Sequence, residues 1–70
     1  MKRFYKGHQI EVSVWQEGGH WFARSYIHYQ QEPQNELVTF DVPYPFKTYN
    51  EAMDAGLTAA QSWIDKKSSL

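Results

Sequence analysis

The sequence contains no cysteine among its 70 residues. Disulfide bridges and thiolate metal sites are therefore excluded as sources of stability. A chain this short lies near the size at which a single core only just offsets the loss of chain entropy. We expect one domain, residues 1–70, whose stability comes from packing, aided by a partner.

The chain also lacks an excess of charge of either sign. Seven Lys and Arg stand against eight Asp and Glu, which gives a formal charge of -1. Such a chain has no overall field that would draw in nucleic acid or an anionic membrane. Met1-Lys2-Arg3 is followed by no apolar segment, and no run approaches the roughly 20 apolar residues of a transmembrane helix. The absence of cysteine agrees with a reducing compartment. We expect a soluble cytoplasmic protein with no membrane partner.

Aromatic residues, in contrast, are abundant, at 17% of the chain against an ordinary 41% for all hydrophobic residues. A few large rings thus take the place of many aliphatic side chains. Many of them lie in residues 19–30, GHWFARSYIHYQ, interleaved with two histidines and an arginine. A strand buries one face, so a segment with rings on both faces needs something to cover the second one.

The first two thirds of the chain have the alternation of β-strands. Ile10, Val12 and Val14 alternate with polar residues, and Gly18-Gly19 supplies a tight turn. The polar stretch 30–35, QQEPQN, predicts an exposed connection. These patterns predict strands at about 3–16, 20–30 and 36–42. Residues 6–8 interrupt the first of them, so Phe4-Tyr5 forms either a separate short strand or a bend.

A helix is predicted after the third strand. Thr48 and Glu51 match a capping box, in which the threonine hydroxyl accepts from the amide of Glu51 and the glutamate accepts from the amide of Thr48. The helix should cover about 49–66, with 67–70 as a frayed tail. Gly56 predicts a close approach of the helix to the strands. Its apolar residues fall on one arc of roughly 160°: Ala52, Met53, Gly56, Leu57, Ala59, Ala60, Trp63 and Ile64.

The two-residue turn fixes the pairing of the strands on either side of it, because directly opposed residues share a face of the sheet. One face then carries the apolar side chains that match the helix, which are Ile10, Val12, Val14, Ala23 and Ile27, with Val38, Phe40 and Val42 from the third strand. The predicted fold is α+β: a three-stranded, or with the N-terminal segment four-stranded, antiparallel sheet with one C-terminal helix on one face.

The opposite face of this sheet has no second helix to cover it. The same register places there Trp15, Phe22, Arg24, Tyr26 and His28. Large exposed rings of this kind are typical of a surface that contacts another molecule. These five residues form the predicted interaction surface. A slip of one residue in the turn would exchange the two faces.

No motif for catalysis, metal binding or phosphate binding is present. His20 and His28 lie eight residues apart on one strand, about 27 Å at 3.4 Å per residue, so they cannot chelate one ion. Gly18-Gly19 is followed by a strand, whereas a phosphate-binding loop needs a helix. The serines have no acid-base partner at a suitable spacing. We therefore expect neither enzyme activity nor a metal or cofactor.

Two classes of partner fit the interaction surface. A protein, either a second copy of the chain or a different one, would contact Trp, Tyr, Phe and Arg, the residues enriched in protein interfaces. A single-stranded nucleic acid would stack its bases on Trp15, Phe22 and Tyr26. The near-neutral charge, with Glu11 beside Tyr26, favours the protein. A third interpretation is that the rings only cover one face of a small sheet and bind no partner.

Several short segments resemble a group of short bacterial proteins of uncharacterised function that have a strand-rich, single-helix domain. They are YKGHQI at 5–10, WFA at 21–23, FKT at 46–48 and WID at 63–65. The resemblance implies this fold and a bacterial origin, and no activity. The third strand and the TYNEA start of the helix are also similar to the N-terminal domain of HicB-type antitoxins, although the Asp-Leu-Pro-Gly-Cys-like segment of that family is missing. This similarity implies an antitoxin-like regulatory role as a further alternative.

Overall fold

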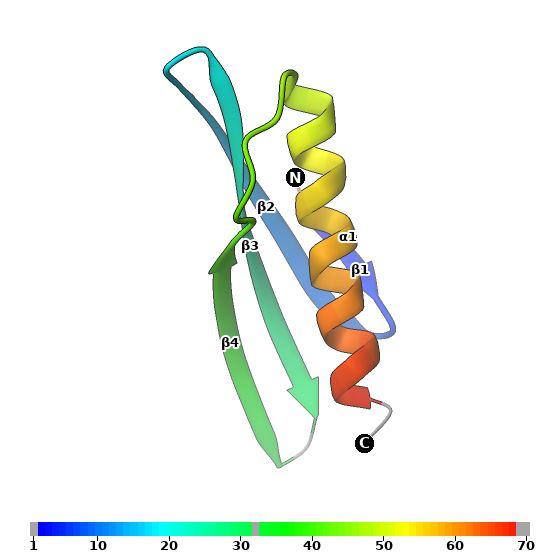
Figure 1. Cartoon of the computed structure of the whole chain (residues 1–70). Coiled ribbons are helices and arrows are strands. Elements are labelled where there is room, and N and C mark those ends of the chain that lie inside the picture. The colour runs from blue at the N-terminus through cyan, green and yellow to red at the C-terminus, as the bar shows by residue number, and fades with distance from the viewer. Residues whose placement is uncertain (1, 32, 69–70) are drawn as a thin grey trace.

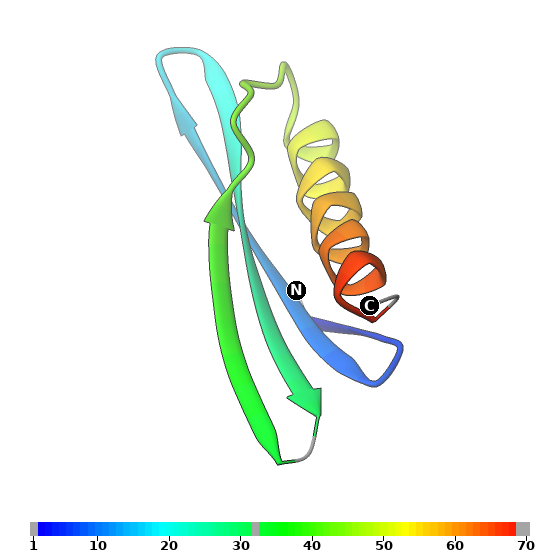
Figure 2. The ribbon, with the colours of Figure 1, turned by 60° about the horizontal axis from the view of Figure 1, so that its bottom comes forward.

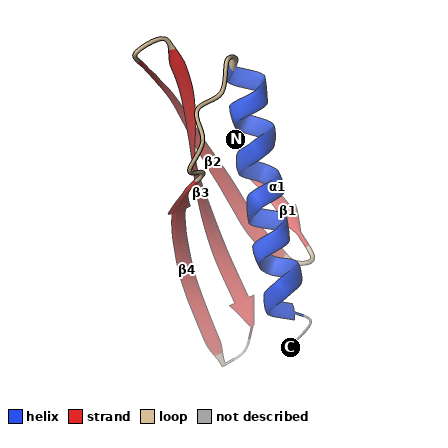
Figure 3. Cartoon of the chain, viewed as in Figure 1, coloured by secondary structure: helices blue, strands red, loops and turns tan. Residues whose placement is uncertain are grey.

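Four strands are followed by one helix in the computed structural model, which describes residues 2–31 and 33–68. The strands form a single antiparallel sheet in the order β1-β2-β3-β4, and α1 lies across one face of it (Figures 1 and 3). The α+β class is thus confirmed, in its four-stranded form. The elements are β1 (Lys2–Tyr5), β2 (His8–Glu17), β3 (His20–Gln31), β4 (Gln34–Asp41) and α1 (Tyr49–Ser68).

The predicted strand 3–16 is divided by a tight turn. Lys6 and Gly7 have φ values of 51° and 83°, and two successive positive values are typical of a type I′ hairpin turn. Phe4 and Tyr5 therefore form a separate edge strand, β1, paired with the start of β2. Gly18 and Gly19, at 58° and 80°, form the second turn of this kind, as predicted.

Two other boundaries differ from the sequence prediction. The polar segment 30–35 belongs largely to the strands, because the pairing of β3 with β4 continues to Gln31 and Gln34, and the amide of Gln30 donates to Nδ1 of His8. The helix continues to Ser68, and Lys66 and Lys67 in its last turn complement the helix dipole. Residues 67 and 68, predicted as part of a frayed tail, are therefore helical, and residues 69–70 lie outside the described part of the chain.

The core lies between α1 and the face of the sheet formed by alternate residues of β2 and β3. Their pairing follows the predicted register, with Ile10 opposite Ile27 and Val14 opposite Ala23. Ile10, Ile27 and Ile64 of the helix are completely buried. The buried hydrophobic residues are Ile10, Val12, Ala23, Ile27, Tyr29, Val42, Ala52, Met53, Ala60 and Ile64.

Helix and sheet lie close together at Gly56. A Cβ atom at this position would lie 2.6 Å from Cγ1 of Val12 and 3.4 Å from Cβ of Ala23. The buried hydroxyl of Ser25 donates a 2.8 Å hydrogen bond to the carbonyl oxygen of Gly56. Small side chains on both elements thus let a strand hydroxyl reach the helix backbone directly.

We expect Ser25→Ala to lower the free energy of unfolding by about 1 kcal/mol, the net contribution of a typical buried hydrogen bond. Urea unfolding would measure this loss. Ser13→Ala is the matched control, because Ser13 is on the neighbouring strand and is exposed. Identical urea midpoints for the two variants would mean that the Ser25 hydrogen bond adds nothing to stability.

The helix is not centred on the sheet. It packs on β2 and β3, and β4 forms the edge of the sheet that extends beyond the helix (Figures 1 and 2). After β4 the chain continues in the same direction along β3, where Phe46 and Trp21 exchange two backbone hydrogen bonds of 2.8 Å. This segment carries the chain to the start of α1, and it leaves the helix-facing side of β4 only partly covered.

Contacts at the end of α1 fix the β1–β2 turn. The Lys6 ammonium lies 2.7 Å from the Asp65 carboxylate, and the Tyr5 hydroxyl donates to the same group. The hydrogen bond from Lys6 holds the pKa of Asp65 below its ordinary value, and the hydrogen bond to Asp65 raises the pKa of Tyr5. Both β1 and the N-terminal end of β2 are therefore tied to the helix.

Candidate interaction surface

The face of the sheet opposite α1, here called the open face, carries the side chains that alternate with the core residues. The pairings of the four strands place these side chains in rows across the sheet. The rows are Trp15 and Phe22; Ser13, Arg24 and Asp41; Lys2, Glu11, Tyr26 and Thr39; and Phe4, Gln9, His28 and Leu37. In the described part of the chain, no helix lies on this face (Figure 2).

All five residues of the predicted interaction surface lie on the open face, and each of them is partly buried. The rings of Trp15 and Phe22 stack with their centroids 5.8 Å apart. The guanidinium of Arg24 lies over the Trp15 ring, 5.3 Å from its centroid. These three side chains form one cluster near the Gly18-Gly19 turn, while Tyr26 and His28 follow further along β3.

Arg24 has its countercharge within the chain. Its Nε donates a 2.6 Å hydrogen bond to Oδ1 of Asp41 on the adjacent strand. This hydrogen bond raises the pKa of Arg24 and lowers the pKa of Asp41. Asp41 thus neutralises the guanidinium that lies over Trp15, so the cluster together with Asp41 carries no net charge.

Two large apolar side chains on the open face were not among the predicted surface residues. Phe4 is 72% exposed and Leu37 is 63% exposed, and they lie at the two ends of the same row. The position of Leu37 follows from the assignment of Val38 and Phe40 to the helix side, so alternation alone could have placed it. The position of Phe4 depends on the Lys6-Gly7 turn, which the sequence pattern left open.

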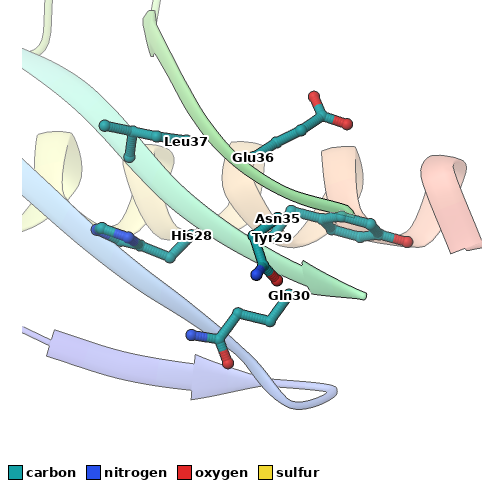
Figure 4. A pocket seen from close by; sticks show the side chains of 6 residues that line it. All are labelled: His28, Tyr29, Gln30, Asn35, Glu36 and Leu37. Carbon is teal, nitrogen blue, oxygen red and sulfur yellow. The ribbon is translucent and has the colours of Figure 1, made fainter. Parts of the chain in front are cut away.

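A shallow hollow of about 310 Å³ lies near the turn of the β3–β4 hairpin, at the end of β3 away from Gly18-Gly19. Figure 4 shows His28 and Leu37 extending to the same side from these neighbouring strands, with the amides of Gln30 and Asn35 beyond them. Alternation puts these four residues on the open face. The open face thus changes along β3 from aromatic at the Gly18-Gly19 turn to polar at the other end.

Two of the three histidines, His8 and His20, make polar contacts with backbone groups of the chain. The Nδ1 atom of His8 accepts a hydrogen bond from the backbone amide of Gln30, and its ring stacks on Tyr29 at 4.2 Å. The Nδ1 atom of His20 lies 3.3 Å from the carbonyl oxygen of Gly18. Among residues 2–31 and 33–68, no three His, Asp or Glu side chains are grouped so that they could hold a metal ion.

No helix in the described ranges is long and apolar enough to cross a membrane. Comparison of the chain with protein-family models, with curated proteins and with solved structures finds no match. The resemblance drawn from short sequence segments therefore stays a prediction.

Proposed function

We propose that this domain is a non-catalytic protein-interaction module that binds through its open face, and that its partner is a second copy of the chain. One observation carries the proposal. A single sheet face presents Phe4, Trp15, Phe22, Tyr26 and Leu37, and α1 packs on the other side. Aromatic side chains with arginine among them are the composition that distinguishes protein interfaces from the remaining surface.

Energetics favour covering these rings. Burying one large apolar side chain contributes about 1.5–3 kcal/mol, which is a large fraction of the stability of a small domain. The core on the other face is small, with few large side chains among its buried members. A partner on the open face would therefore add stabilisation that the domain cannot obtain from its own core.

The charges on the open face suit a symmetric contact. Lys2 lies opposite Glu11 in the strand pairing, and Arg24 is paired with Asp41. Each cation thus has an anion beside it, so the face can lose water against a similar face without leaving an uncompensated charge. A twofold axis, which brings the same patch of both copies together, is the commonest arrangement of such dimers.

A dilution series of ¹⁵N-labelled protein followed by NMR would locate the contact. We expect the amide signals of Phe22, Tyr26 and Leu37 to move as the protein is diluted, because these residues leave the interface. Signals of Thr58 and Ser62, which are exposed on α1, should remain in place. Movement restricted to α1 would contradict the proposed surface.

One observation favours a single-stranded nucleic acid as a second candidate partner. The Arg24 guanidinium lies beside Trp15 and Phe22, and β1 adds Lys2 to the same face. Bases stack on such rings, while cations meet the phosphates. Asp41 and Glu11 lie next to these two cations, however, and would repel a phosphate chain.

We therefore expect only weak, salt-sensitive binding to single-stranded DNA or RNA, with a Kd above about 10 µM at physiological salt. Fluorescence anisotropy with labelled oligonucleotides would measure the Kd. Tyr44→Ala is the matched control for Phe22→Ala, because Tyr44 is an exposed ring outside the open face. Submicromolar binding that Phe22→Ala abolishes and Tyr44→Ala preserves would promote the nucleic acid above the protein partner.

A further inference from the structure

The strand β4 lies at the outer edge of the sheet. It pairs with β3 along its whole length, from Gln34 to Asp41. The strand order places no other strand of the described chain on its second side. Figures 1 and 2 both show this side of β4 facing away from the remaining elements.

The direction of the free backbone groups follows from one hydrogen bond. The amide of Val42 donates to the carbonyl oxygen of Ala23 at 2.9 Å, one residue beyond the β3–β4 ladder. Backbone groups in an antiparallel pair point alternately toward the partner and away from it. The even-numbered residues of β4 therefore bond to β3. The N–H and C=O groups that point outward belong to Asn35, Leu37, Thr39 and Asp41.

This edge lacks most of the usual protection against pairing, and its charged side chains are the two carboxylates Glu36 and Asp41. Natural edge strands are commonly very short or carry lysine, proline or a bulge. The eight residues of β4, QNELVTFD, include no lysine or proline, and their pairing with β3 has no bulge. The opposite edge, β1, has four residues and carries Lys2 and Arg3.

A groove lies beside the C-terminal end of this edge, on the helix side of the sheet. Because α1 packs on β2 and β3, a hollow of about 560 Å³ remains between the helix and the segment from Phe40 to Phe46, which includes the last two residues of β4. Its apolar lining includes Phe40, Val42 and Phe46 from the strand side and Ala55 and Ala59 from α1. Asp54 lies at its helix rim, is exposed, and forms no ion pair with any described residue.

We propose that β4 accepts an extended segment of a different polypeptide as a fifth strand, and that this segment is apolar at alternate positions and carries a Lys or Arg. Main-chain hydrogen bonds to the four outward-pointing residues would supply binding, and side chains entering the groove would supply specificity. The basic residue would pair with Asp54.

Charge decides between this partner and a second copy of β4. The strand contains two acidic residues, Glu36 and Asp41, and no basic one. Both carboxylates of β4 are already paired, with Lys67 and Arg24, so a second copy of β4 would bring neither free charge nor a basic residue for Asp54. A segment with a basic residue is complementary to Asp54, so the occupant should carry a Lys or Arg.

The probe is a capped heptapeptide, Thr-Val-Thr-Phe-Thr-Lys-Thr, which places Val, Phe and Lys on one side when extended. It is titrated into ¹⁵N-labelled protein carrying Phe22→Asp, so that contacts through the open face do not contribute. We expect the amide signals of Leu37 and Thr39 to shift and their hydrogen exchange to slow. Asp54→Lys should weaken binding about fivefold, the scale of an exposed ion pair. Thr39→Pro, which removes one outward-pointing N–H, should also weaken it.

Several results would overturn the inference. One is the absence of shifts in β4 at about 1 mM peptide, the weak end of specific affinities. A second is equal affinity in the Asp54→Lys variant, whose exposed position leaves folding intact. A third is movement of the β4 signals when the protein alone is concentrated, which would identify a second copy as the occupant. None of these results decides whether the wild-type chain associates through the open face, because the protein used carries Phe22→Asp.

Discussion

Gly56→Leu should unfold the domain at a far lower urea concentration than Thr58→Leu. A side chain at position 56 begins only 2.6 Å from Val12 Cγ1, and valine has few rotamers with which to move aside. Overpacking of this kind typically costs about 1–3 kcal/mol, and we expect a loss at the upper end of that range. Thr58 is exposed, so its replacement should change the free energy of unfolding by less than about 0.5 kcal/mol.

Gly56→Ala tests the same contact through the sign of its effect. In an unhindered helix this change stabilises by about 1 kcal/mol, because alanine has the higher helix propensity. Here we expect destabilisation, which the additional change Val12→Ala should partly relieve, since the two side chains compete for one space. Equal urea midpoints for Gly56→Leu and Thr58→Leu would contradict the close approach of helix and sheet.

Much of the fold could be predicted because short-range signals agree with one another. Gly18-Gly19 allows a type I′ turn, and this turn leaves one register for β2 and β3. That register places the aliphatic residues of β2, Ile10, Val12 and Val14, on the side that the helix arc requires. Thr48 also begins the helix as predicted, accepting a 3.1 Å hydrogen bond from the amide of Glu51.

Other features depend on geometry that no local pattern encodes. Lys6 adopts a positive φ that lysine rarely shows, so the turn between β1 and β2 gives a weak sequence signal. The Glu51 carboxylate accepts from the Thr48 hydroxyl, whereas the capping box predicts the Thr48 amide as donor. Phe46 lies in the loop between β4 and α1, and no local sequence pattern predicts its pairing with Trp21.

For the candidate interaction surface, too, local sequence patterns predict some contacts and not others. Alternation was sufficient to place Trp15, Phe22 and Tyr26 on one face, because β2 and β3 share a hairpin. The pairing of Arg24 with Asp41 also requires the register of β3 with β4. A polar connection containing proline, QQEPQN, does not determine that register.

We expect Phe22→Asp to abolish self-association while leaving the domain folded. Phe22 lies in the stacked aromatic cluster on the open face, and a carboxylate there would lose its hydration in the dimer without gaining a partner. Substitutions at the centre of an interface often cost 2 kcal/mol or more, so dimer affinity should fall by at least roughly thirtyfold. Tyr44→Asp, the same charge at an exposed ring outside the open face, should leave the affinity unchanged.

Sedimentation equilibrium of the wild-type protein from a few micromolar to several hundred micromolar tests self-association through the open face most directly. We predict that the average mass rises with concentration from that of one 8.3 kDa chain toward that of two, and that Phe22→Asp removes the rise. Several hundred micromolar is roughly the weak end of protein affinities. A wild-type protein that keeps the mass of one chain over the whole range would contradict the homodimer.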